Sequence, residues 1–304
     1  MSTKKTRRNF FQSITASGLA TGLLSSKNAF AKGDAPLRPS YMNPEGDRYI
    51  DPRNVLLYEC TRREIRERIN SGQLKAAIIP TGSTEHHNEH IAMVMDIATS
   101  LLISQHAALK VFPQAIVTTP VAIGYSPYWM ERQGTLTLRK DIFLGVVYDI
   151  CCSMKTHGID TILIVNGHGG NVKPLKEAAP DFSSELNIKI EACSYWDSFP
   201  KDRWREFIDV GIVAGHAGEF ETSIALAAFP ERVHRVTYEG TDPYKWDVDR
   251  KDLERVGYYK ESFDTPESDR SNFEESKHAS AEKGERIIAH AVNWLANKLQ
   301  KMIG

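Results

Sequence analysis

Four short apolar runs along the chain predict buried β-strands. Residues 161–165 are all apolar or β-branched, which is typical of a parallel strand covered on both faces. Residues 76–79 form a shorter apolar run that predicts another core strand. Residues 115–121 and 188–195 predict two more.

The segments between and after these runs have the composition of helices. Helices are predicted at residues 61–71, 97–109, 141–157 and 172–186, from shortly after His216 to about residue 228, and at 280–303. Thr61 is an N-cap candidate with Glu64 three residues on, the spacing of a capping box. Pro180 is expected to interrupt its helix. Strands that alternate with helices predict an α/β fold, with a mostly parallel sheet and helices on both faces.

Three other stretches lack these patterns. Residues 32–53 are rich in Pro, Gly and charge and predict a linker, whereas residues 196–215 are expected to be irregular or partly helical. Residues 235–275 are polar with few apolar positions, which predicts a long surface excursion. The 304 residues are 41% hydrophobic and 25% charged, a composition that suits one large globular domain. The net charge of −1 predicts no nucleic-acid partner.

The N-terminus predicts export. A basic segment with the pair Arg7-Arg8 precedes a mildly apolar stretch at residues 13–24 and the sequence Ala29-Phe-Ala31, which is typical of a cleavage site. This arrangement resembles a twin-arginine signal, so residues 1–31 are read as a signal peptide and residues 32–304 as the folded domain of a periplasmic or exported protein. A disordered basic tail is the alternative. The apolar run is shorter than the roughly 18–20 residues that span a membrane, so no membrane insertion is expected after cleavage.

The four cysteines predict neither a metal site nor a required disulfide. No pair of them has the C-x-x-C spacing of metal and redox sites. Cys151 and Cys152 lie in an apolar helical stretch, where they are read as small buried hydrophobic residues.

The chain's most distinctive polar stretch follows the predicted strand at 76–79. Residues 80–96 contain three histidines and three carboxylates: Glu85, His86, His87, Glu89, His90 and Asp96. So many ionisable groups beside a buried strand are costly unless something binds them. Imidazole and carboxylate are natural ligands of divalent metals, so the stretch predicts a metal site.

Two later stretches are candidates for the rest of this site. Asn166-Gly-His-Gly-Gly-Asn171 directly follows the strand at 161–165, and ligands of open α/β sheets bind beyond the carboxyl ends of strands. His216-Ala-Gly-Glu-Phe-Glu-Thr-Ser223 opens a predicted helix. Glu219 and Glu221 are two residues apart, about 200° around a helix, so only one of them should face the site unless the helix starts after Glu219.

These three stretches resemble motifs of the creatininase (creatinine amidohydrolase) family. The family's first motif runs Gly-Ser-x-Glu-Gln-His-Gly-Pro-His, followed after five residues by Asp. This chain has Gly82-Ser-Thr-Glu-His-His-Asn-Glu-His90 and then Asp96. The resemblance covers about residues 50–300. It implies a three-layer α/β/α sandwich, a binuclear metal centre and hydrolysis of a C–N bond in a small amide, cyclic amides included.

The resemblance also assigns roles. Glu85, Asp96 and His168 would hold one divalent ion. His87, Asp96 and a glutamate would hold the second, and Asp96 would bridge them. In creatininase that glutamate lies two residues after the histidine of the second motif, where this chain has Gly170; Glu221 is the expected replacement.

His216 would shuttle a proton to the leaving nitrogen, with Glu221 beside it at the catalytic site. The implied ions are Zn²⁺, Mn²⁺ or Fe²⁺. The implied partners are a small amide substrate and further copies of the chain in a homo-oligomer, a hexamer among the options.

Several departures from the family pattern leave the substrate open. His86, Asn88 and Glu89 replace Gln, Gly and Pro; His86 and Glu89 contact the substrate or are solvated loop residues, and His90 has no assigned role. Tyr125, Tyr128 and Trp129 form pocket walls or simply core. The tryptophan-bearing region that encloses creatinine is not recognisable before His216, so creatinine is not the expected substrate.

Three rival functions remain. Family resemblance also allows a metal-dependent peptidase or deformylase. A metallo-phosphoesterase is disfavoured because no Arg/Lys cluster lies near the motifs in the sequence. A non-catalytic exported metal-binding protein would have no need of His216.

Overall fold

The computed structural model describes residues 54–234, 248, 252 and 266–304. The predicted signal peptide, the linker at 32–53 and most of the predicted excursion at 235–275 lie outside the described residues. Within the described part, no helix combines the length and the apolar character needed to cross a membrane.

Four parallel strands form the central sheet, as the apolar runs predict. They are β1 (Ala76–Thr81), β2 (Ala115–Val117), β3 (Thr161–Asn166) and β4 (Lys189–Ser194), in the order β2-β1-β3-β4. β1 pairs with β3 along its whole length, from Ala76 opposite Thr161 to Thr81 opposite Asn166. β2 ends earlier than predicted; Val121 rejoins the edge of β1 only through an isolated bridge to Thr81.

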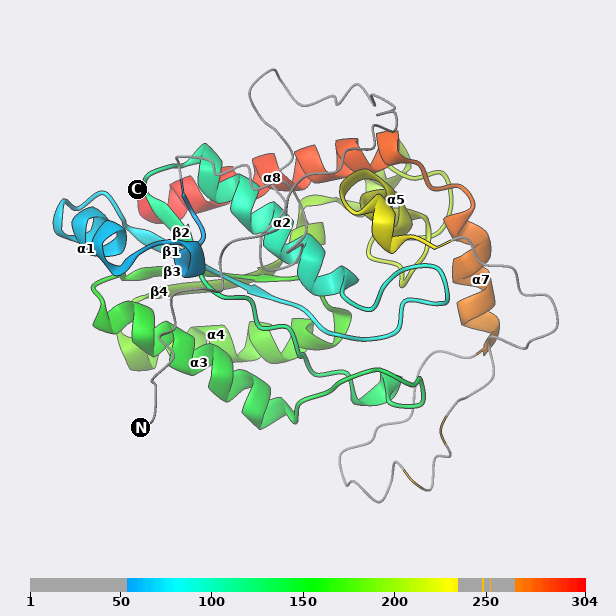
Figure 1. Cartoon of the computed structure of the whole chain (residues 1–304), viewed down its shortest axis with the longest axis horizontal. Helices are drawn as coiled ribbons and strands as arrows, with labels where there is room; N and C mark the ends of the chain where they lie inside the picture. Colours follow the sequence, from blue (N-terminus) through cyan, green and yellow to red (C-terminus); the bar gives the residue numbers. More distant parts are fainter. Residues whose placement is uncertain (1–53, 235–247, 249–251, 253–265) are drawn as a thin grey trace, which may run out of the picture. The chain divides into compact units, whose positions relative to one another are not determined.

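The sheet is covered on both faces, so the fold is an α/β sandwich (Figure 1). α2 (Met95–Lys110) and α8 (Ala281–Ile303) lie on one side, whereas α3 (Lys140–Thr156) and α4 (Val172–Leu186) lie on the other. Both faces of β1 are buried, which explains why residues 76–79 are all apolar. Ala76 and Ile78 join the hydrophobic cluster of α2 and α8, whereas Ala77 and Ile79 join that of α3 and α4, because successive side chains point to opposite faces.

The other α-helices of the described part of the chain are α1 (Arg62–Asn70), α5 (Glu219–Ala228) and α7 (Pro266–Ser276). α1 begins with the predicted capping box, in which Thr61 N donates to Glu64 Oε2 at 2.6 Å and Glu64 N donates to Thr61 Oγ1 at 3.3 Å. α5 packs closely on α8: a side chain at Gly284 of α8 would collide with the carbonyl oxygen of Ser223. Glycine at this position therefore lets the two backbones meet.

One expectation about the elements was wrong, and another stretch holds a helix that was not expected. α4 continues through Pro180 without interruption. Proline removes one helical hydrogen bond, but Pro180 is exposed, so water can reach the carbonyl group that loses its partner. The predicted surface excursion ends in a helix, α7, whose Asp269 is buried and forms an ion pair with Arg132.

All four cysteines are free thiols. Burial raises the pKa of the Cys151 thiol, and that of Cys193, to about 12. Cys151 is fully buried, as expected, whereas Cys152 is partly exposed. A thiol with so high a pKa forms little thiolate and reacts slowly.

The strand order contains a switch point at β1. In the order β2-β1-β3-β4, the chain moves to opposite sides of β1 when it forms β2 and β3. A crevice opens beyond the carboxyl ends of the strands at such a switch point, and ligands bind there. The motifs after β1 and β3 therefore emerge side by side.

Candidate metal centre

Two glycines allow the start of α2 to lie against the strand ends. A side chain at Gly82, just after β1, would come within 2.6 Å of the Ile97 nitrogen, and one at Gly167, just after β3, would collide with the Asp96 carbonyl oxygen. Only glycine leaves room for this approach. As a result, Asp96 in the first turn of α2 is held between the ends of the two central strands.

Glu85, Asp96 and His168 form the first ligand group. His168 Nδ1 lies 3.1 Å from Glu85 Oε1 and 3.0 Å from Asp96 Oδ2, and all three side chains are buried. Their ligand atoms are close enough to share one metal ion. This is the set that family resemblance assigns to one ion.

His87, Asp96 and Glu221 form the second ligand group. His87 Nε2 lies 3.0 Å from Asp96 Oδ1 and 3.6 Å from Glu221 Oε2, and the ligand atoms again lie within 4.8 Å of one another. The other ring nitrogen, His87 Nδ1, lies 3.1 Å from the Glu85 carbonyl oxygen. A histidine that donates one N–H to a carbonyl presents its other nitrogen as a lone pair, the usual arrangement of a metal ligand.

Asp96 belongs to both groups and presents a different oxygen to each histidine. Three buried carboxylates and two buried imidazoles thus converge on one small volume. The donors are nitrogen and oxygen atoms of the kind that Zn²⁺ and Mn²⁺ accept. The arrangement fits two neighbouring divalent ions that share the Asp96 carboxylate.

The charges of the site depend strongly on one another. Burial alone would lower the pKa of His87, but Asp96 and Glu221 outweigh it and raise the value to about 10. Burial raises the pKa of Glu221 to about 7, against the opposing effect of His87. Protons and divalent ions therefore compete for the same buried carboxylates and imidazoles.

The two glutamates of the third motif point in different directions. Glu221 faces the site and accepts a hydrogen bond from Ala217 N at 2.7 Å. Glu219, the first residue of α5, accepts hydrogen bonds from Asp209 N and Val210 N and pairs with Lys283 of α8. Only one of the pair lies in the site, as the helical spacing predicts, and Glu219 instead ties α5 to its surroundings.

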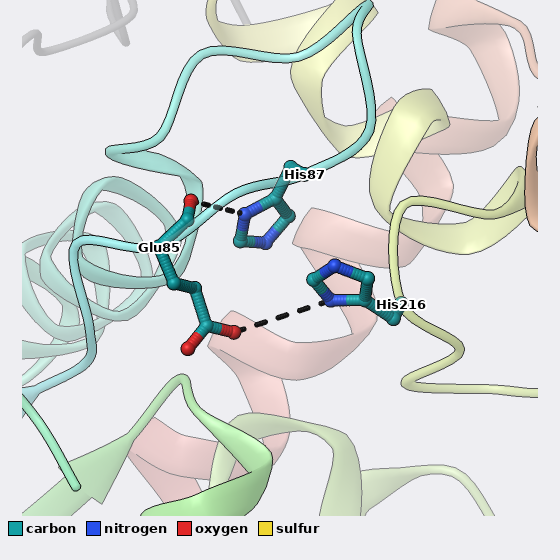
Figure 2. Close-up of side chains that lie close together, drawn as sticks. All are labelled: Glu85, His87 and His216. Carbon is teal, nitrogen blue, oxygen red and sulfur yellow. Dashed lines mark hydrogen bonds and ion pairs between the residues drawn. The ribbon is translucent and has the colours of Figure 1, made fainter. Parts of the chain in front are cut away.

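His216, from the segment before α5, lies beside Glu85 and His87, and the ligand atoms of these three residues are also close enough to share a metal ion (Figure 2). Its Nδ1 lies 4.0 Å from Glu85 Oε1. Its ring stacks on Trp129 with centroids 4.4 Å apart. Burial, together with the neighbouring His87, His86 and His168, holds the pKa of His216 well below its usual value. The imidazole is therefore neutral at pH 7.

The other residues of the first motif divide into separate roles. His86 is buried with its ring against Trp129 and His216, at centroid distances of 4.2 and 4.8 Å. Glu89 is exposed, as expected of a solvated loop residue. His90 is buried and its Nε2 lies 3.0 Å from Thr222 Oγ1, so it joins the first motif to α5.

Asn88 replaces the family's glycine at a position that requires a left-handed backbone. Its φ is +53°, a conformation that glycine adopts freely and asparagine more readily than most residues. The substitution therefore preserves the shape of the loop. The Asn88 side chain also donates to the Asp269 carbonyl oxygen of α7 at 3.1 Å.

A pocket of about 630 Å³ opens onto the ligand groups. Its lining includes Glu85, Asp96, His168, His216 and Glu221 together with the aromatic residues Tyr125, Tyr128, Trp129 and Trp196. The loop that carries Tyr125, Tyr128 and Trp129, called the aromatic loop below, is thus a pocket wall. Two exposed lysines, Lys140 and Lys173, also line it; the sequence does not reveal them because they lie outside the motifs.

Gly170 explains how this chain departs from creatininase at the second motif. A side chain there would collide with the Tyr128 hydroxyl and the Tyr125 carbonyl oxygen and would lie 2.6 Å from His168 Nε2. The space near position 170 is therefore filled by tyrosines. Glu221, from a different element, stands in the second ligand group instead.

Two further features of the site were not predicted. Ser126, fully buried between Glu85 and His168, hydrogen-bonds with both; a serine inside an aromatic loop carries no pattern that marks it. The Arg132–Asp269 ion pair joins the segment after the aromatic loop to α7. No local sequence pattern links two residues so far apart in the chain.

Comparison with known proteins gives consistent relatives. Creatinine amidohydrolase of Pseudomonas putida is 26% identical over 268 residues, which are 82% of this chain and 97% of that protein. The 3-dehydro-scyllo-inosose hydrolase of Thermotoga maritima is 28% identical over 198 residues, 63% and 62% of the two chains. The mycofactocin precursor peptide peptidase of Mycobacterium ulcerans is 26% identical over 166 residues, 51% and 59% of the chains.

Solved structures share the fold. A crystal structure of creatinine amidohydrolase superimposes with a TM-score of 0.65 at 25% identity and covers 82% of this chain and 98% of that one. A Zn–Zn form of a creatininase mutant gives a TM-score of 0.63, and a Mn creatininase gives 0.62. Each of these two is 24% identical and covers 82% of this chain and 98% of its own.

A family model described as creatininase, creatinine amidohydrolase, matches residues 58–299. That range contains both ligand groups, His216 and every strand of the sheet. The chain is therefore a member of the creatininase family of hydrolases.

Proposed function

We propose that the protein is an exported metal-dependent amidohydrolase that cleaves a C–N bond of a small amide, cyclic amides included. The observation that carries this proposal is the position of Asp96, which is shared by two ligand groups that face one pocket together with His216. The relative from Pseudomonas putida, named for its action on creatinine, supports the same reaction class.

The chain's own residues would hold two divalent ions. Glu85 and His168 would complete one site and His87 and Glu221 the other, with Asp96 between them. Zn²⁺ and Mn²⁺ are the first candidates because creatininases of both kinds are known among structures of this fold; Fe²⁺ suits the same donors. Bound at this centre, such ions would lower the pKa of a water molecule and polarise the amide carbonyl.

His216 would move the proton that the reaction requires. An amine leaves poorly unless it is protonated, so an acid is needed beside the pocket. His216 is neutral at pH 7, lines the pocket and directs Nδ1 towards Glu85. It can therefore take a proton from the attacking water and deliver it to the leaving nitrogen, while Trp129 fixes the plane of its ring.

The pocket supports a substrate larger than a single small ring. A volume of about 630 Å³ falls in the range of sites for drug-sized ligands, and four aromatic side chains supply apolar walls. Lys140 and Lys173 add positive charge at the rim. A peptidase acting on a short peptide is therefore the second candidate, and the mycofactocin precursor peptide peptidase is a relative with that type of activity.

The proposal is tested by metal analysis together with a substrate panel. We expect purified protein to contain two divalent ions per chain and to hydrolyse at least one member of a panel of cyclic amides, formamides and short peptides. Turnover of peptides alone would favour the peptidase function over the amidohydrolase function. Bound metal with no turnover of any member would favour the non-catalytic metal-binding protein. Protein that takes up no divalent ion after dialysis against Zn²⁺ or Mn²⁺ would refute the metal centre.

Export and assembly form a separate part of the proposal. The paired arginines and the Ala29-Phe-Ala31 site support twin-arginine export to the periplasm, with the mature chain starting near Lys32. Replacing Arg7 and Arg8 by lysine should retain the protein in the cytoplasm. We also propose a homo-oligomer, a hexamer among the options, and light scattering of purified protein that gives a monomer mass would refute it.

A further inference from the structure

Ser126 lies between two residues of the first ligand group. It precedes a short 3₁₀ helix, Pro127–Trp129, and its side chain is fully buried. Its Oγ lies 2.6 Å from Glu85 Oε2 and 2.9 Å from His168 Nε2. Ser83, from the loop after β1, adds a third contact, with the two serine Oγ atoms 2.6 Å apart.

The chemistry of these groups fixes which atom donates in each contact. An ionised carboxylate only accepts hydrogen bonds, whereas a serine hydroxyl has one hydrogen to donate. Ser126 must therefore donate its hydrogen to Glu85. Its lone pairs remain to accept hydrogen bonds from the Ser83 hydroxyl and from His168 Nε2.

A second contact leads to the same tautomer of His168. Nε2 also lies 3.2 Å from the Tyr125 carbonyl oxygen, which can only accept, and 3.1 Å from the Tyr128 hydroxyl. Both Ser126 and Tyr125 thus require a hydrogen on Nε2. In the neutral ring, Nδ1 is then the lone pair that faces Glu85 Oε1 and Asp96 Oδ2, at 3.1 and 3.0 Å.

We propose that Ser126, with Ser83 behind it, is the positioning residue of the first ligand group: its hydroxyl holds Glu85 in place and keeps His168 in the tautomer that offers Nδ1 to a divalent ion. This inference rests on the proposed metal centre. No comparable hydroxyl bridges the two ligands His87 and Glu221 of the second group among the described contacts. The effect of Ser126 should therefore be confined to one of the two ions.

The test measures Zn²⁺ affinity by competition with a chelator in two backgrounds. His87→Ala removes a ligand of the second group and leaves the first intact, whereas His168→Ala does the reverse. In the His87→Ala protein we expect Ser126→Ala to weaken Zn²⁺ binding by roughly 10- to 100-fold, the usual cost of losing a hydrogen-bond partner of a metal ligand. In the His168→Ala protein, we expect Ser126→Ala to leave affinity unchanged.

Three further variants sharpen the result. Ser126→Thr keeps the hydroxyl and should restore most of the affinity. Ser83→Ala should weaken the same ion by a smaller factor, and it replaces Ser126→Ala as the deciding variant if that protein does not fold. Ser104→Ala is the matched control, because Ser104 is also a fully buried serine but its hydroxyl has no hydrogen-bond partner among the described residues.

Equal Zn²⁺ affinity with and without the Ser126 hydroxyl in the His87→Ala background would overturn the inference, as would equal losses in both backgrounds. Wild-type protein that binds no Zn²⁺ would instead refute the proposed metal centre. The two failures are therefore distinguishable.

Discussion

Trp129 lies nearly flat against His216, with the ring planes 26° apart and the centroids separated by 4.4 Å. This stacking holds the His216 imidazole so that Nδ1 points towards Glu85. A proton carrier gains from a fixed orientation because transfer requires hydrogen-bond reach of the reacting atom. The relationship gives the aromatic loop a second contact with the candidate site, in addition to its place in the pocket wall.

His216→Ala should therefore reduce turnover while leaving both ions bound. Loss of a general acid–base group costs roughly 10²-fold or more, and His216 belongs to neither ligand group that shares Asp96. Turnover of the best substrate and metal content together check this. His157→Ala, at the exposed end of α3, is the control and should change neither. Undiminished turnover in His216→Ala would remove this residue from proton transfer.

Asp96→Ala should release both ions, because Asp96 supplies an oxygen to each group. His87→Ala, by contrast, should release only the second. Elemental analysis of the two purified variants after identical dialysis gives the comparison. Retention of one tightly bound ion in Asp96→Ala would show that the carboxylate does not bridge.

The two glutamates of α5 should give opposite results when changed to glutamine. Glu221→Gln should lose the second ion and leave the fold intact. Glu219→Gln should keep both ions but lower the free energy of unfolding by about 1.5–3 kcal/mol, the contribution of a hydrogen bond to a charged group, because it weakens the contact with Lys283. Metal content and urea unfolding separate the outcomes. Metal loss in Glu219→Gln without loss of stability would reverse the assignment.

Neighbouring glycines offer a test of packing around His168. Gly170→Ala should disturb the first group and lower its metal affinity, since the added carbon would collide with Tyr125 and Tyr128 and approach His168 Nε2. Gly169→Ala is the matched control, because no atom lies within 4 Å of the position its side chain would take. Chelator competition on both variants measures the difference in metal affinity. Equal affinities would show that Tyr125 and Tyr128 move aside at little cost.

Removing metal should make stability fall as the pH rises. In the metal-free protein, obtained with a chelator, His87 and His168 have pKa values of about 10. In an unfolded chain the pKa of histidine is roughly 6.5. Groups with raised pKa values bind more protons in the folded state, so their contribution is complete below about pH 6.5 and is lost towards pH 10. Urea midpoints of chelated protein measured across that window should fall steadily. A rising midpoint would contradict the predicted charge state.

The sequence indicates the sheet and most ligands because both leave local patterns. Continuous apolar runs mark β1 and β3, and the polar residues directly after them meet because parallel strands end at one edge of a sheet. The choice between Glu219 and Glu221 needs the exact start of α5, which local propensity places only within a few residues. Spacing alone predicts that one of the two glutamates faces the site, but it does not identify which one.

Other features depend on contacts between distant segments. Asp269 reads as part of a polar surface stretch, yet Arg132 compensates its charge inside the protein. Pro180 reads as a helix breaker, but the exposed position tolerates the missing hydrogen bond. Ser126 is recognised only from its contacts with Glu85 and His168, which come from other segments of the chain.

The close packing of α5 on α8 has a consequence for how the protein is made. A nascent chain that has emerged from the ribosome as far as α5 already contains every candidate ligand, Glu221 included. It still lacks α8, the helix on which α5 rests through Gly284 and Ser223. Because α5 rests on α8, we expect the second ligand group to form only after α8 has docked.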